Sequence, residues 1–186
     1  SRVPLDALLD FMPGGFNSIP DIVARRATVA QILASMPVPP NPNVTTEDRA
    51  VPGPEGDPDI SVRIYRPVGT SAATGTLPGI YYIHGGGMVL GDVAGEDANA
   101  ARRCEEVGAV VVSVEYRLAP EHPHPAPVED CYAGLTWTAG NAAGLGIDPA
   151  RLAIYEGSAG GGLALGTVLL ARDRGGPALA FMMPIY

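Results

Sequence analysis

The chain alternates between short apolar runs and longer segments with helical periodicity. Apolar runs at 79–84, 109–116 and 152–156 predict central strands, because parallel strands are covered on both faces and carry few polar residues. A segment with helical periodicity accompanies each run. These predicted helices cover residues 95–107, 127–139 and 159–173. The alternation predicts an α/β fold, with a mostly parallel central sheet flanked by helices.

Three further segments are predicted to be strands outside the central apolar runs. Residues 44–51 form one, 60–66 a second, and 178–186 a third that is apolar enough to be buried. Apolar and polar positions alternate in the second strand. The alternation directs Ile60, Val62 and Ile64 inward and Ser61, Arg63 and Tyr65 outward. The third strand has no partner for its outer edge, and such an edge favours association, either as a homo-oligomer or with another polypeptide.

The N-terminal region predicts a separate helical cap. Two helical segments are expected, Pro4 to Phe11 and Pro20 to Met36, and Pro20-Asp21 suits a first helical turn. A proline-rich linker follows them. The sequence therefore predicts a cap or lid at residues 1–42 and a core at residues 43–186.

Composition narrows the classes of function. With 186 residues, 46% hydrophobic, the chain suits a single core, and its net charge of −8 argues against nucleic-acid and anionic-membrane partners. No apolar run is long enough to span a membrane, and no signal peptide is recognisable, so a cytoplasmic location is expected. The sequence contains no lysine, and His122 and His124 lack a Cys or His cluster. We therefore expect no cofactor and no metal.

One serine stands where a catalytic nucleophile belongs. Ser158 lies at the corner between an apolar strand and a helix that opens with glycines. A nucleophile elbow needs small residues around this corner, because the helix approaches the strand closely. Ala159 and the glycines after it satisfy this need. The position two residues before the serine, where the motif has glycine, holds Glu156, and the glycine is found at Gly157.

A second glycine cluster supports the catalytic interpretation. His84-Gly85-Gly86-Gly87 follows a predicted strand, and backbone N–H groups of such a loop can form half of an oxyanion hole. Taken alone, a glycine triplet is equally typical of a flexible turn. Together with the serine elbow, it favours acyl-transfer chemistry.

Three motifs in this order resemble the bacterial hormone-sensitive-lipase family of carboxylesterases. They are His84-Gly85-Gly86-Gly87, Tyr116-Arg117-Leu118-Ala119-Pro120-Glu121 and Gly157-Ser158-Ala159-Gly160-Gly161. The resemblance implies an α/β-hydrolase fold that cleaves short-chain acyl esters of small molecules. It further implies that Ser158 is the nucleophile, that Gly86, Gly87 and Ala159 donate to the oxyanion, and that His84 positions the loop. Met88, after the glycines, is expected to line an apolar acyl site.

The family's remaining catalytic groups are missing from the sequence. In this fold the triad follows the chain order Ser, then Asp or Glu, then His. All three histidines, His84, His122 and His124, precede Ser158, and Asp173 falls on the helix that Ser158 opens. We therefore expect an incomplete core, without the C-terminal strands and helices, whose Asp and His come from a C-terminal segment or a second chain.

Two other functions remain open. The altered elbow and the missing base would suit a catalytically inactive module that binds a small ligand, as in plant hormone receptors that resemble this family. A structural fragment whose exposed sheet edge recruits a partner is the third alternative.

Overall fold

A computed structural model describes residues 18–35 and 39–185 of the chain, which divides into two units, residues 1–39 and 40–186. In the first unit, α2 (Ile22–Ser35) confirms the second predicted N-terminal helix. Its first turn is capped by Asp21, whose Oδ1 accepts a hydrogen bond from the Ala24 N–H at 2.7 Å. The other predicted helix, Pro4 to Phe11, lies outside the described residues. The domain boundary after residue 42 and the role of a lid stay predictions.

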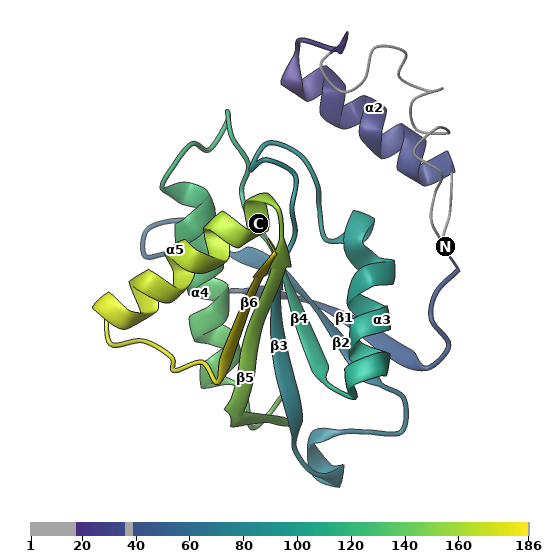
Figure 1. The fold of residues 1–186 in the computed structure, drawn as a ribbon, viewed down its shortest axis with the longest axis vertical. Helices are drawn as coiled ribbons and strands as arrows, with labels where there is room; N and C mark the ends of the chain where they lie inside the picture. The colour runs from purple at the N-terminus through teal and green to yellow at the C-terminus, as the bar shows by residue number, and fades with distance from the viewer. Residues whose placement is uncertain (1–17, 36–38, 186) are drawn as a thin grey trace. The chain divides into compact units, whose positions relative to one another are not determined.

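The second unit is built on one twisted sheet (Figure 1). Its strands lie in the order β1-β2-β4-β3-β5-β6. The β1–β2 and β2–β4 pairs are antiparallel, and the other pairs are parallel. The strands are β1 (Val44–Val51), β2 (Ile60–Pro67), β3 (Leu77–Ile83), β4 (Val110–Glu115), β5 (Ile147–Gly157) and β6 (Phe181–Ile185).

Helices cover both faces of this sheet. They are α3 (Asp97–Val107), α4 (Ala126–Gly140) and α5 (Ala159–Asp173), with short 3₁₀ turns η2 (Ala72–Thr74) and η3 (Ala94–Glu96). On one face, α4 and α5 pack side by side and enclose a core that includes Ile83, Leu135 and Ile154 (Figure 1). On the other face, α3 packs against β2 and β4. The predicted order of strands and flanking helices is confirmed.

The outward position predicted for Tyr65 is wrong. Tyr65 is fully buried among residues of α3 and β4, and its hydroxyl donates to Asp97 Oδ1 at 2.5 Å. Alternation correctly places Tyr65 on the opposite face of β2 from Ile64. Because α3 covers that face, the side chain is buried in a second hydrophobic core. Arg63, on the same face, is held by Asp48 and Asp97.

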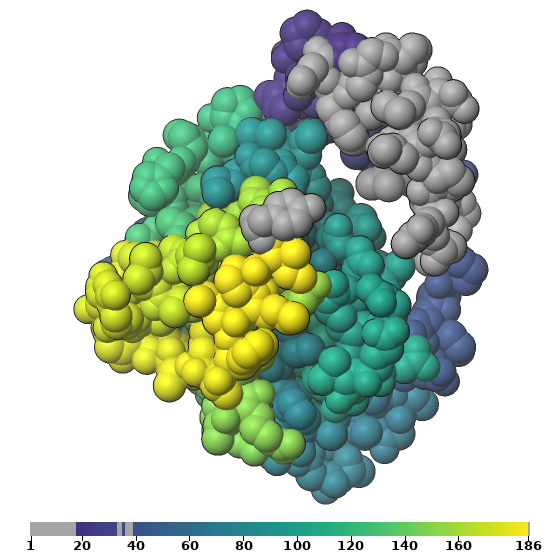
Figure 2. All heavy atoms as spheres, viewed as in Figure 1, coloured from purple at the N-terminus to yellow at the C-terminus, as the bar shows by residue number. Residues whose placement is uncertain are grey.

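The burial predicted for the last strand is also not observed. On β6, Phe181, Met183 and Ile185 are 59%, 47% and 37% exposed. They pair in register with Ala153, Tyr155 and Gly157 of β5, so they share the sheet face on which α3 lies. That helix packs over β2 and β4, and β6 is left at the surface (Figure 2).

Candidate active site

Ser158 forms a tight corner between β5 and α5. Its backbone has φ 59° and ψ −123°, a conformation that non-glycine residues seldom adopt, and its side chain is exposed. The Ser158 N–H donates to Ile185 O at 2.9 Å, and the Gly161 N–H donates to Ser158 O at 2.8 Å. This strained, exposed corner has the geometry expected of a nucleophile elbow, and the role of Ser158 as nucleophile stays a prediction.

Small residues are required around this corner. A β-carbon at Gly160 would lie only 2.6 Å from Ile83 O and 3.1 Å from His84 O. A β-carbon at Gly85 would lie 2.9 Å from Gly157 O. The absence of side chains therefore brings the helix and the glycine loop against the elbow.

The glycine loop has an unusual backbone conformation. Three successive residues have positive φ, namely Gly86 (118°), Gly87 (67°) and Met88 (62°). Within the described residues, the N–H groups of Gly86 and Gly87 donate to no protein acceptor. Ala159 opens α5, and a helix leaves its first N–H groups without an intrahelical partner. The three predicted oxyanion donors therefore lie in two segments that contact each other at the elbow.

His84 is a buried part of the loop. Its Nδ1 lies 2.8 Å from Gly85 O, which assigns the proton to Nδ1, and its ring stacks on Tyr116 at 4.2 Å between centroids. Burial lowers the pKa of His84, so the ring is neutral. Among the described residues its Nε2 has no hydrogen-bond partner, and it lies 3.8 Å from Glu115 Oε1, too far for a hydrogen bond. This environment suits the predicted positioning role and does not suit a general base.

Glu156 is buried beside the elbow. The side chain is fully buried, and neither carboxylate oxygen has a hydrogen-bond partner within the described structure. Burial raises the pKa of this carboxyl, and the nearby Ile185 N–H opposes the shift only in part. In contrast, a β-carbon at Gly157 would meet no atom within 4 Å. The unusual order of these two residues thus places a carboxyl group where it is poorly solvated.

None of the described side chains acts on Ser158 as a base. His122 and His124 are exposed on the loop before α4, and Asp173, at the end of α5, pairs with Arg172 at 2.7 Å. Within residues 18–35 and 39–185, no histidine is hydrogen-bonded to the Ser158 hydroxyl. The described part of the chain therefore contains a candidate nucleophile and candidate oxyanion donors, and none of its histidines is bonded to that serine.

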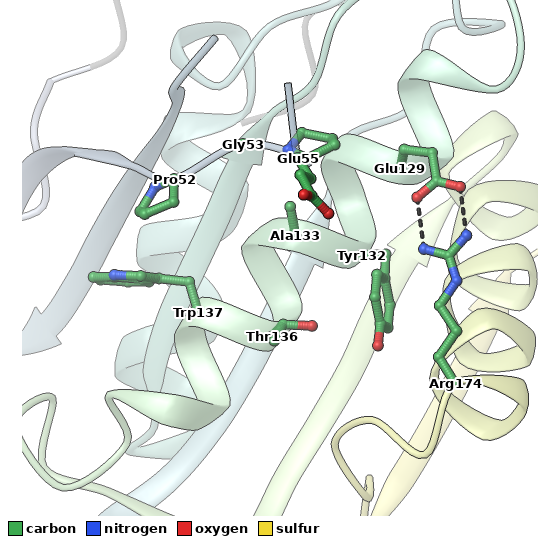
Figure 3. A pocket seen from close by; sticks show the side chains of 10 residues that line it. Pro52, Gly53, Glu55, Glu129, Tyr132, Ala133, Thr136, Trp137 and Arg174 are labelled. Atoms are coloured by element: carbon green, nitrogen blue, oxygen red, sulfur yellow. Dashed lines mark hydrogen bonds and ion pairs between the residues drawn. The ribbon is translucent and has the colours of Figure 1, made fainter. Parts of the chain in front are cut away.

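A cavity of about 290 Å³ adjoins Ser158. It is lined by Tyr82, Gly85, Glu96, Arg103, Tyr155, Gly157, Ser158 and Ile185. A second, of about 360 Å³, lies between α4, the β1–β2 connection and Arg174, which pairs with Glu129 (Figure 3). It contains none of the predicted site residues. Met88 is partly buried against the core, and a β-carbon at Gly162 would lie 3.6 Å from its Cε.

Other types of site find no support in the part of the chain that is described. There, no cluster of three or more His, Cys, Asp or Glu side chains could hold a metal ion, and no helix is long and apolar enough to cross a membrane. Cys104 and Cys131 are free and buried, and burial raises the pKa of Cys104 to about 12. Both thiols are therefore poor nucleophiles.

Comparisons with known proteins agree with this geometry. A family model described as alpha/beta hydrolase fold matches residues 80–186. Carboxylesterase NlhH of Mycobacterium tuberculosis is 41% identical over 184 residues, which cover 98% of this chain and 55% of that protein. An arylesterase of Saccharolobus solfataricus is 36% identical over 166 residues, 89% of this chain and 50% of that protein.

Solved structures extend the likeness to three dimensions. A bacterial heroin esterase is 41% identical and superimposes with a TM-score of 0.82, over 88% of this chain and 51% of that one. The chain thus spans about half the length of the curated relatives and solved structures that it matches.

Proposed function

The chain belongs to the α/β-hydrolase family, and from that premise we propose that it forms the nucleophile-bearing part of a serine carboxylesterase acting on short-chain acyl esters. The observation that carries the proposal is the strained, exposed Ser158 at the N-terminus of α5. It contacts a glycine loop in which the N–H groups of Gly86 and Gly87 donate to no acceptor among the described residues. Relatives named as carboxylesterase and arylesterase support the same chemistry.

The proposed reaction proceeds through an acyl-enzyme. Ser158 Oγ attacks the ester carbonyl carbon while a base removes its proton, and a tetrahedral intermediate with a negative oxygen forms. The N–H groups of Gly86, Gly87 and Ala159 stabilise that oxygen. Collapse of the intermediate expels the alcohol and leaves an ester between the acyl group and Ser158. Water then attacks this ester through a second tetrahedral intermediate, and the acid and the free serine are released.

The proposal places the acid and the base of the triad on polypeptide that this chain does not contain, either a continuation or a second chain. Two observations support this. No described histidine is bonded to Ser158, and the sheet face beside Ser158 is partly bare at β6. An Asp and a His that approach Ser158 across this face would complete the site.

The proposed substrates carry a small apolar acyl group. Met88 is partly buried next to the oxyanion loop and, with the apolar residues after it, provides a limited hydrophobic surface. Burial of a short acyl chain there would contribute binding energy at about 0.8 kcal/mol per methylene group.

The direct test is hydrolysis of p-nitrophenyl acetate by the chain, alone and joined to a C-terminal half taken from an esterase relative. We expect turnover only in the joined form, and its loss in Ser158→Ala, which removes the attacking oxygen and leaves the loop unchanged. Turnover that persists at the wild-type rate in Ser158→Ala would refute the assignment.

A ligand-binding module without catalysis is the second candidate. The buried Glu156 in the elbow and the absence of a base among the described residues favour it. A joined form that binds a short-chain ester tightly but releases no alcohol would support this function over an esterase.

A further inference from the structure

The segment that follows β4 contacts both ends of the oxyanion loop. At the first end, the Tyr116 hydroxyl donates to His84 O at 2.9 Å, and the two rings stack with an interplanar angle of 14°. At the other end, the Ala119 N–H donates to Met88 O at 2.9 Å. Gly86 and Gly87 lie between these two points. The loop is therefore tied to β4 and its extension on either side of its proposed donors.

This segment is itself held rigidly from α4. Asp130, which is fully buried, accepts from the backbone N–H and from Nε of Arg117, both at 2.9 Å, and from Nη2 at 2.7 Å. Asp57 accepts two further hydrogen bonds from the same guanidinium, at 3.0 and 2.9 Å. A bidentate carboxylate contact fixes both position and orientation. Residues 116–119 thus form a stiff support.

The loop needs such a support. Its own backbone bonds join the Val89 and Leu90 N–H groups to Gly86 O, and three residues in a row have positive φ. A conformation of this kind persists only where the surroundings impose it. Burial raises the pKa of Tyr116, so its phenol remains a donor over the physiological range.

We infer that Tyr116 is a positioning residue for the oxyanion hole. Through its contacts with the His84 carbonyl and ring, Tyr116 holds the Gly86 and Gly87 N–H groups in place. The inference rests on the proposed esterase function. Electrostatic stabilisation depends on donors fixed before the reaction begins, so a small displacement of the loop weakens binding of the intermediate more than binding of the substrate.

The variant Tyr116→Phe removes the hydroxyl and keeps the ring that stacks on His84. In an ester-hydrolysing form of the protein, we expect kcat to fall about 10-fold or more with KM within about 2-fold, as for a misplaced oxyanion donor. Tyr81→Phe is the matched control, because Tyr81 is similarly buried and its hydroxyl donates to Cys131 O at 2.9 Å and not to a loop residue. A control with the same loss of kcat would overturn the inference.

A second variant separates the loss of loop support from a general loss of packing around Tyr116. Arg117→Lys keeps the charge but cannot form the paired contacts with Asp130 and Asp57, so the support should loosen while Tyr116 remains. We expect a smaller fall of kcat in the same direction, again without a change in KM. An increase in KM alone would mean that this segment shapes the substrate pocket and not the oxyanion hole.

Amide hydrogen exchange tests the same inference without any activity, on the 186-residue chain itself. In Tyr116→Phe, peptides that cover residues 84–91 should exchange faster than in the wild type, whereas Tyr81→Phe should leave them unchanged. Unchanged exchange in Tyr116→Phe would overturn the inference. If exchange rises but no form of the protein hydrolyses esters, the support stands and the proposed function fails.

Discussion

At the scale of single residues, Ser158 and Glu156 together define the elbow. Ser158 is held at a positive φ, at a cost of about 1–3 kcal/mol that the packing of β5 and α5 must offset. Two residues earlier, the fully buried carboxyl group of Glu156 has no hydrogen-bond partner among the described residues. Both features destabilise the corner, but only the first has an evident use, because it exposes the hydroxyl.

Glu156 should make the stability of the chain depend on pH. Burial raises its folded-state pKa above the ordinary 4.5, so the native state favours the protonated form. The stabilising contribution of Glu156 is fully present when the pH is below the ordinary pKa of 4.5, and it is lost as the pH rises through the folded-state pKa. Glu156→Gln cannot ionise. The difference in Tm between this variant and the wild type should therefore shift in favour of the variant as the pH rises from 4.5 to 8. Circular dichroism measures both values.

The control for this prediction is Glu55→Gln, which alters an exposed carboxylate in the β1–β2 connection. The pH dependence of its Tm, measured in the same way, is the reference for Glu156→Gln. A Tm difference between Glu156→Gln and wild type that stays constant with pH would show that the Glu156 carboxyl is solvated or paired.

Residue-level prediction from the sequence succeeded where a local rule decides the structure. The corner at Ser158 follows from the small residues around it, which sterics require. Tyr65 was placed wrongly because alternation identifies opposite faces of a strand but cannot tell that a helix covers the second face. The contacts of Tyr116 were missed for a related reason: an aromatic residue at the end of a strand gives no sign of which loop it will meet.

At the scale of elements, the glycine loop should tolerate substitution unequally. A β-carbon at Gly86 would lie 2.0 Å from Leu90 O at φ 118°, whereas one at Gly87 would approach only the Val89 side chain, at 3.6 Å. We expect Gly86→Ala to lower kcat about 10²–10³-fold with little change in KM, as on loss of an oxyanion donor, and Gly87→Ala to have a smaller effect.

The matched control for the loop is Gly69→Ala. Gly69 also has positive φ (81°), but a β-carbon there meets no atom within 4 Å and the residue lies in the turn after β2. This variant should lose some stability and keep its kcat. Equal effects of Gly86→Ala and Gly69→Ala on kcat would show that only backbone strain was measured.

The predicted elements agree with the structure because their patterns are strong. The runs at β3, β4 and β5 are apolar on both faces. Glycine or proline marks the ends of the helices between them, as Gly108 does after α3 and Pro125 before α4. β6 was recognised as a strand, but its burial was not. Composition alone shows that Phe181, Met183 and Ile185 suit a covered face, and it cannot show whether anything lies on that face.

At the scale of the whole molecule, the bare face of β6 should make the chain associate. The side chains of Phe181 and Met183 are 59% and 47% exposed on a strand at the edge of the sheet, an arrangement that favours pairing with another chain. We expect oligomers of the purified chain in light scattering at micromolar concentration, and a shift toward monomer in the double variant Phe181→Lys with Met183→Glu.

Val107→Lys provides a control for the association. Val107 is 57% exposed at the end of α3, so this variant replaces a similar apolar surface at another place. It should leave the oligomers intact. A wild-type chain that is monodisperse and monomeric would contradict the prediction.

The sequence predicted the general layering of the molecule and the candidate nucleophile, but not the source of the missing base. Layering follows from local periodicity, and the nucleophile from one corner of the chain. A triad, in contrast, is assembled from segments far apart in sequence, and His84, His122 and His124 could be set aside only by the order expected in this fold. Their burial, contacts and exposure in the structure point the same way.

The most direct test of the account is covalent labelling with a fluorophosphonate, followed by mass spectrometry of the proteolytic peptides. The reagent requires a serine that is activated by a base and stabilised by an oxyanion hole. We predict an adduct on Ser158 when the chain is joined to a segment that supplies Asp and His, and little or none on the 186-residue chain alone. A joined form that hydrolyses esters but is labelled elsewhere, or never at Ser158, would contradict the assignment of the nucleophile.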